Sequence, residues 1–146
     1  MVINEIQNLK ALHRDAPIFI TGHSLGGALA TLAAVDVHQT YGLNSLITFG
    51  EPRVGNQQFS DFFKPVVTNY RVTHYADIVP HIPLTAQGFY HEGDEVWYNS
   101  AMSSYQICAY GESSKCSNSL LPTSYNTGDH SMSTYLKLPA SFYEQI

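Results

Sequence analysis

A serine flanked by glycines constrains the fold of this chain more than any other feature. Residues 18–30 read I-F-I-T-G-H-S-L-G-G-A-L-A, with Ser24 between Gly22 and Gly26. An apolar strand that enters a small-residue helix through G-x-S-x-G predicts a nucleophile elbow, which holds the serine hydroxyl clear of a sheet. We expect glycine at both flanks because the turn strains the serine backbone and a Cβ at Gly22 or Gly26 would collide with neighbouring chain. The alternative is an idle serine in a glycine-rich turn.

Apolar periodicity places further elements around this turn. The expected helices cover 1–13, 24–41, 55–63 and 131–138, and the expected strands cover 18–21, 46–49 and 69–75. Strand 18–21 is wholly apolar, as is typical of a parallel sheet that is covered on both faces. Strands that alternate with helices predict an α/β fold, with a parallel sheet and right-handed crossovers.

The second half of the chain has a different texture. Residues 78–85 form a loop punctuated by prolines, and 89–91 is expected to pair with 95–98 as a hairpin about Gly93. Residues 100–129 are rich in serine and asparagine, and so long an irregular segment within a compact domain is usually functional.

Length and charge limit the classes of partner. The 146 residues are expected to form one domain, 1–146, with a net charge of −5 and only 7 Lys and Arg. With no basic cluster to neutralise phosphates, nucleic acid is excluded as an expected partner. The longest apolar run, around 28–35, is too short to span a bilayer, and residues 1–10 lack the pattern of a signal peptide.

The two cysteines, Cys108 and Cys116, lie in a polar stretch that is typical of a loop. Neither belongs to a C-x-x-C pair or to a set with zinc-ligand spacing, and the H-E-G-D-E run at 91–95 lacks the second histidine of a zinc-protease motif. We therefore expect no metal and no cofactor, and a disulfide that indicates an oxidising compartment. Two free thiols are the alternative.

A nucleophilic serine needs a base and an acidic group that orients the base. In a sheet of this kind the chain order is serine, then Asp or Glu, then histidine. Asp77 directly follows the expected strand 69–75 and is the best-placed orienter. The other candidates are expected to be solvated on helices or idle in the hairpin turn: Asp36, Asp61 and Asp94.

Seven histidines compete for the role of base. His130 follows the long irregular segment, where the base is expected. His23 is expected to be structural, with its ring directed away from Ser24, and Asp129 is expected to cap the helix at 131–138. The remaining histidines are expected on helix surfaces, packed in a strand, or too early in the chain order: His13, His38, His74, His81 and His91.

Five ordered blocks of the chain together resemble the class 3 lipases, the fungal-type triacylglycerol lipases of the α/β-hydrolase fold. The blocks are I-T-G-H-S-L-G-G-A at 20–28, T-F-G-E-P-R-V-G-N at 48–56, R-V-T-H-Y-A-D-I-V-P-H-I-P at 71–83, G-F-Y-H-E-G-D-E-V-W-Y at 88–98 and D-H at 129–130. The resemblance implies that Ser24 is the nucleophile, Asp77 the orienter and His130 the base, as the spacing also indicates. It implies the Leu25 N–H as one oxyanion donor.

The same resemblance implies hydrolysis of acylglycerol esters through an acyl-enzyme, at a lipid–water interface and, for the intact family, outside the cell. The family also has an N-terminal half with further strands, a helical lid and a loop that completes the oxyanion hole. We find no counterpart of that half and expect an α/β-hydrolase fold that is incomplete at the N-terminus. A feruloyl esterase, a phospholipase A1 and an impaired remnant that binds lipid or a partner are the alternatives.

Overall fold

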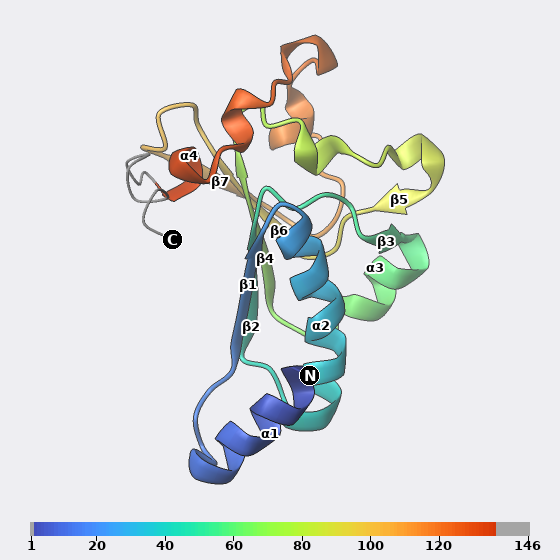
Figure 1. Ribbon diagram of the computed structural model, residues 1–146. Helices are drawn as coiled ribbons and strands as arrows, with labels where there is room; N and C mark the ends of the chain where they lie inside the picture. Colours follow the sequence, from blue (N-terminus) through green and yellow to red (C-terminus); the bar gives the residue numbers. More distant parts are fainter. Residues whose placement is uncertain (1, 137–146) are drawn as a thin grey trace.

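A mostly parallel sheet organises the computed structural model, which describes residues 2–136 (Figure 1). Its five strands lie in the order β1-β2-β4-β6-β7. The first four run parallel and β7 is antiparallel to β6. The strands are β1 (Phe19–His23), β2 (Ser45–Phe49), β4 (Asn69–His74), β6 (Asp94–Tyr98) and β7 (Tyr105–Cys108). The expected α/β class is confirmed.

Helices lie on both sides of this sheet, but they cover it unequally. Figure 1 shows α2 and α3 on one side and the short α4 on the other, near the end of the strands. The helices are α1 (Val2–Leu12), α2 (Leu25–Tyr41), α3 (Gln57–Phe63) and α4 (Met132–Leu136). The α2 residues that are buried against the sheet are small, which allows close approach: Gly27, Ala30, Thr31, Ala34 and Val37. Together with Leu46, Phe63 and Val67, Ala30 and Ala34 form the hydrophobic core.

The expectation that β1 is covered on both faces is wrong. Strand β1 is the end strand of the sheet, and the Phe19 side chain is 65 % exposed. The side chain of Ile20 packs on the core beneath α2, whereas Phe19 points to the opposite face. Of the helices in residues 2–136, only α4 packs on that face, and it reaches only the ends of the strands.

The expected hairpin about Gly93 is also wrong. Strand β5 (Phe89–Tyr90) pairs with β3 (Gly55–Asn56) in a separate two-stranded sheet, and β6 pairs in parallel with β4. Asp94 therefore opens β6 and does not lie in a turn. Helix α3 begins later than expected because Asn56 caps it, its Oδ1 accepting the N–H of Phe59 at 2.9 Å.

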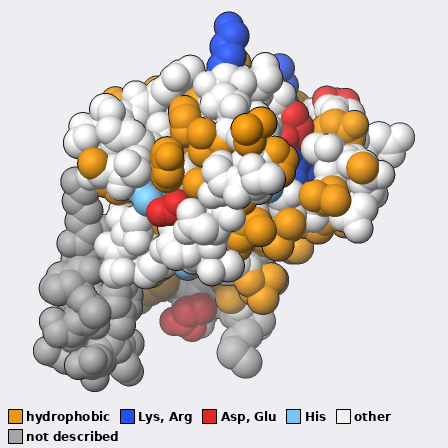
Figure 2. Space-filling model, turned by 90° about the horizontal axis from the view of Figure 1, so that it is seen from above, with side chains coloured by type: hydrophobic (Ala, Val, Ile, Leu, Met, Phe, Trp, Pro, Cys, Tyr) orange, Lys and Arg blue, Asp and Glu red, His pale blue; other side chains and the backbone are white. Residues whose placement is uncertain are grey.

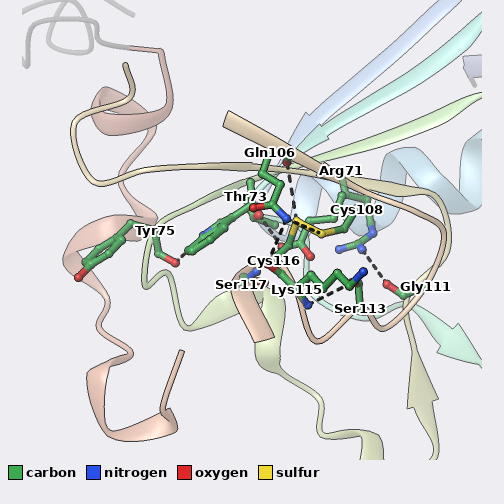
Figure 3. The surroundings of a disulfide bond; sticks show 12 residues. Arg71, Thr73, Tyr75, Gln106, Cys108, Gly111, Ser113, Lys115, Cys116 and Ser117 are labelled. Atoms are coloured by element: carbon green, nitrogen blue, oxygen red, sulfur yellow. Dashed lines mark hydrogen bonds between the residues drawn. A yellow bond between two sulfur atoms is a disulfide. The ribbon is translucent and has the colours of Figure 1, made fainter. Parts of the chain in front are cut away.

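The long segment at 100–129 contains more structure than its composition suggests. It includes β7 and two 3₁₀ turns, η3 (Ser117–Ser119) and η4 (Pro122–Ser124), and a third, η5 (Gly128–His130), overlaps its end. The expected disulfide is confirmed: Cys108 at the end of β7 is joined to buried Cys116 (Figure 3). The bond ties η3 to the edge of the sheet.

The loop at 78–85 holds the 3₁₀ turn η1 (Val79–His81), and η2 (Thr85–Gln87) overlaps its end. The helix expected at 131–138 is observed as α4, and the remainder of that expectation lies outside the described residues. Over residues 2–136, no helix combines the length and the apolar character needed to cross a bilayer.

Candidate active site

The turn between β1 and α2 has the strained geometry of an elbow. Ser24 has φ of 57°, a left-handed value that non-glycine residues rarely adopt, and its N–H donates to the Phe49 carbonyl at 2.9 Å. A Cβ on Gly22 would overlap the Gly26 carbonyl, so glycine is required there. A Cβ on Gly26 would meet no described atom within 4 Å, and the expected crowding at that position is wrong.

The structure brings the three expected residues together. The His130 Nε2 lies 2.7 Å from the Ser24 Oγ, and the His130 Nδ1 lies 2.9 Å from the Asp77 Oδ2. A carboxylate only accepts, so the Nδ1 carries the proton and the Nε2 is free to accept the hydroxyl proton. Ser24 and His130 are 106 positions apart in the sequence, and the fold alone brings them together.

Asp77 is held more firmly than its sequence neighbourhood predicts. Its Oδ1 accepts the Val79 N–H at 2.8 Å, and its Oδ2 also accepts the Tyr135 hydroxyl at 2.7 Å. Burial raises the pKa of Tyr135 well above its ordinary value, and the negative charge of Asp77 raises it further. Tyr135 therefore remains a donor. Sequence reasoning missed it, because a tyrosine on a short helix carries no motif.

Two neighbours limit the space around the His130 ring. Gly50 has φ of +55°, and a Cβ there would lie 2.9 Å from the Asp77 Oδ2 and 3.0 Å from the His130 Nδ1. The His23 ring also stacks on the His130 ring, with centroids 4.6 Å apart. His23 is thus part of the site, which the expected position of its ring did not anticipate.

The other candidate residues lie apart from the triad. Buried His74 is packed as expected, with its Nδ1 3.4 Å from the Asp129 Oδ1. Asp129 does not cap α4: the Ser131 Oγ accepts an N–H of the first turn of that helix, from Ser133. As expected, exposed side chains on helices or in their flanks include Asp36, Asp61 and His13, whereas His38 is half-buried.

His81 and His91 are buried, which lowers the pKa of both rings, and the positive charges of Arg53 and Arg71, respectively, lower it further. In residues 2–136, His, Cys, Asp and Glu side chains do not gather in threes at a spacing that would hold a metal ion.

A pair of buried carboxyl groups lies behind the elbow. Glu51 follows Gly50, is 1 % exposed, and accepts hydroxyl hydrogen bonds from Thr31 and Thr48, each at 2.5 Å. Glu92 is fully buried, and neither of its carboxyl oxygens has a hydrogen-bond partner among the described residues. Burial, followed by the negative charge of Glu51, raises the pKa of Glu92 to about 8.

The pKa of Glu51 is also raised by burial, although hydrogen bonds from the threonines and the positive charge of Arg71 oppose the shift. We interpret the two carboxyl groups as a unit that holds a proton at neutral pH, because two adjacent buried negative charges are costly.

Fold and site together place the chain in the α/β-hydrolase class, with a sharp strand-to-helix turn at Ser24 after β1 and His130 on a late loop beside it. The family model for lipase (class 3) matches residues 1–87. The chain belongs to the class 3 lipase family.

Curated relatives agree with the family assignment. A lipase from Rhizopus niveus is 40 % identical over 124 residues, which are 80 % of this chain and 32 % of the relative. A lipase from Rhizomucor miehei is 43 % identical over 113 residues, 72 % of this chain and 31 % of the relative. A secreted mono- and diacylglycerol lipase A from Penicillium cyclopium is 36 % identical over 100 residues, 68 % of this chain and 33 % of the relative.

The structure of lipase II from Rhizopus niveus has a TM-score of 0.84 and 38 % identity, over 88 % of this chain and 51 % of that one. Another solved structure is that of a triacylglycerol lipase whose catalytic centre is described as a serine protease triad. It has a TM-score of 0.80 and 37 % identity, over 88 % of this chain and 53 % of that one. The chain thus spans about a third of the curated relatives and half of the solved chains.

Proposed function

We propose that this chain forms the triad-bearing part, residues 1–146, of an α/β-hydrolase domain that hydrolyses acylglycerol esters. The main support is the Ser24–His130–Asp77 arrangement on a strained elbow, with both hydrogen bonds shorter than 3 Å. Relatives named as lipases agree with an ester as substrate.

The proposed reaction has two halves. The Ser24 Oγ attacks the ester carbonyl while the His130 Nε2 takes its proton, and a tetrahedral oxyanion forms. When this intermediate collapses, the bond to the alcohol oxygen breaks and His130 protonates that oxygen. A water molecule, deprotonated in turn by His130, attacks the acyl carbon. The bond from that carbon to the Ser24 Oγ then breaks, His130 returns the proton to the Ser24 Oγ, and the fatty acid is released. Asp77 stabilises the imidazolium through the Nδ1–H in both halves.

The oxyanion needs donors that are already in position. Leu25 is the first residue of α2, where N–H groups have no partner within the helix and the helix dipole favours negative charge. We assign its N–H as one donor. We propose that the second comes from a part of the family domain that this chain does not span. Loss of one such donor costs on the order of 10²–10³ in rate.

We propose a lipid ester at a lipid–water interface as the substrate. Leu25, Leu29 and Leu32 project from the outer side of α2 and are all more than half exposed, and this stripe begins beside the nucleophile. Seen from above, hydrophobic side chains gather at the end of the molecule that carries the triad (Figure 2). Exposed leucines next to the nucleophile favour an apolar acyl substrate over a soluble polar one. The disulfide supports an extracellular location.

The second candidate function is a lipid-binding module that is catalytically impaired. The exposed apolar side chains of α2 and β1 favour it, because they would bind lipid even where the oxyanion hole is incomplete.

Labelling of Ser24 distinguishes these two functions. The chain is incubated with a fluorophosphonate probe and with p-nitrophenyl esters, in parallel with Ser24→Ala and with the exposed control Ser114→Ala. We expect wild type and Ser114→Ala to be labelled and to turn over ester, and Ser24→Ala to do neither. A folded wild-type chain that binds vesicles without labelling would overturn the enzyme proposal.

A further inference from the structure

His23 makes two contacts with His130 that the proposed mechanism does not use. It is the last residue of β1, directly before the nucleophile. Its ring stacks on the His130 ring at 27°, and its Nε2 lies 2.9 Å from the His130 backbone carbonyl oxygen. A carbonyl oxygen only accepts, so the Nε2 carries the proton and a neutral His23 has a bare Nδ1.

These contacts connect two distant parts of the chain. His130 lies in η5, and its imidazole has to approach Ser24 within hydrogen-bond distance in order to act. The triad hydrogen bonds hold only the imidazole nitrogens, whereas His23 holds the backbone carbonyl and one face of the ring. Tyr135 packs edge-on against His23 with centroids 5.6 Å apart, which limits its freedom to move away.

We propose that His23 is a positioning residue that places the base His130 against Ser24, through a hydrogen bond to its carbonyl and through ring stacking. The inference rests on the proposed role of His130 as base. His23 lies between Gly22 and Ser24 in the elbow, and the triad mechanism by itself gives this residue no role.

The protonation state of His23 fits this role. Burial lowers the pKa of His23, the hydrogen bond to the His130 carbonyl partly opposes the shift, and a positive charge on His130 lowers the pKa further. Among residues 2–136, the negative charge of Asp77 raises the pKa of His23, and Tyr135 is the other titratable side chain that contacts the His23 ring. His23 therefore stays neutral while His130 takes and returns the proton.

Two variants separate the two contacts. His23→Phe keeps an aromatic ring for stacking but has no N–H for the carbonyl. His23→Gln keeps an N–H near the position of the Nε2 but loses the ring. His38→Gln is the matched control, since half-buried His38 lies near the other end of α2.

The first measurement is the rate of fluorophosphonate labelling from pH 5 to 9. For His23→Phe we expect kinact to fall about tenfold with KI unchanged, which is the loss expected of one good hydrogen bond. For His23→Gln we expect labelling within about threefold of wild type, a milder loss typical of one aromatic contact. His38→Gln should match wild type. Unchanged labelling by His23→Phe, with the fold intact by circular dichroism, would overturn the proposal.

The second measurement does not depend on turnover. In ¹⁵N-labelled protein, imidazole nitrogen shifts identify the tautomer of each histidine, and we expect His23 as the Nε2–H form. His130→Gln should raise the measured pKa of His23, because the neighbouring positive charge is removed. An Nδ1–H tautomer would overturn the proposal. A chain that is never labelled, but shows this tautomer and this shift, would refute the proposed function and leave the contact of His23 established.

Discussion

The buried carboxyl of Glu92 should make this protein less stable as the pH rises. Most acidic groups in folded proteins have the opposite effect, because their pKa is lowered on folding. The group is fully buried, and its pKa is raised from 4.5 to about 8. Below pH 4.5 the carboxyl is protonated in both the folded and the unfolded chain. Between pH 4.5 and about 8 the unfolded chain releases the proton while the folded chain keeps it, so the free energy of unfolding falls as pH rises.

The size of the effect follows from the same shift. One pH unit corresponds to about 1.36 kcal/mol, so at pH 7 the raised pKa of Glu92 lowers the free energy of unfolding by about 3 kcal/mol. The loss levels off near 5 kcal/mol above about pH 8, where the folded group also ionises. Glu92→Gln has nearly the same volume and no charge to bury. Its amide can also donate to the Glu51 carboxylate.

We expect Glu92→Gln to match wild type near pH 4.5 and to be more stable by about 3 kcal/mol at pH 7. Urea unfolding at pH 5, 6, 7 and 8, followed by the fluorescence of the single tryptophan, measures the difference. Glu5→Gln, which changes an exposed carboxyl on α1, is the control and should show no such trend. A difference that is absent at pH 7, or that shrinks as pH rises, would refute the reasoning.

Three further outcomes are expected. Tyr135→Phe removes one donor from buried Asp77, which should lower the free energy of unfolding by about 1–3 kcal/mol in urea and slow labelling of Ser24. Gly50→Ala forces a Cβ against the Asp77 Oδ2 and the His130 Nδ1, so labelling should fall on the order of 10²-fold, as expected when a base is displaced. Reducing the disulfide, which closes a loop of sequence separation 8, should lower the free energy of unfolding by about 2.5 kcal/mol, measured with and without reductant.

Each of these outcomes has a result that contradicts it. Tyr135→Phe with unchanged unfolding would mean that its hydroxyl does not stabilise the carboxylate. Gly50→Ala with normal labelling would show that the space around the Asp77–His130 pair is less confined than the contacts indicate. An unfolding midpoint that is insensitive to reductant would show that the crosslinked loop is already restricted in the unfolded chain.

Local sequence was sufficient for the elements that carry the nucleophile. An apolar run, two glycines and a run of small residues predict β1, the elbow and α2, because strand, turn and helix each depend on neighbouring residues. The order of Ser24, Asp77 and His130 along the chain predicted three side chains that the fold brings within hydrogen-bond distance of one another. The disulfide between Cys108 and Cys116 could also be predicted, since only two cysteines are present.

The sequence could not show which strands pair with each other, because pairing depends on the whole fold. An apolar run next to Gly93 is compatible with a hairpin, but β6 pairs with β4 and β5 pairs with β3. The same limit applies to burial. An apolar strand such as β1 carries no sign of whether it ends a sheet, so its sequence could not show that Phe19 is exposed.

The sequence by itself determined the kind of chemistry, because residue types, their order and a glycine-bounded turn are properties of the chain. Only the tertiary structure decided which groups surround the triad and which carboxyl groups are buried together. Tyr135, His23 and the Glu51–Glu92 pair act through contacts between residues far apart in the sequence, and such contacts exist only after the sheet has assembled. Their pKa values depend on burial in the same way, since a carboxyl or an imidazole is desolvated by the whole fold and not by its neighbours in the chain.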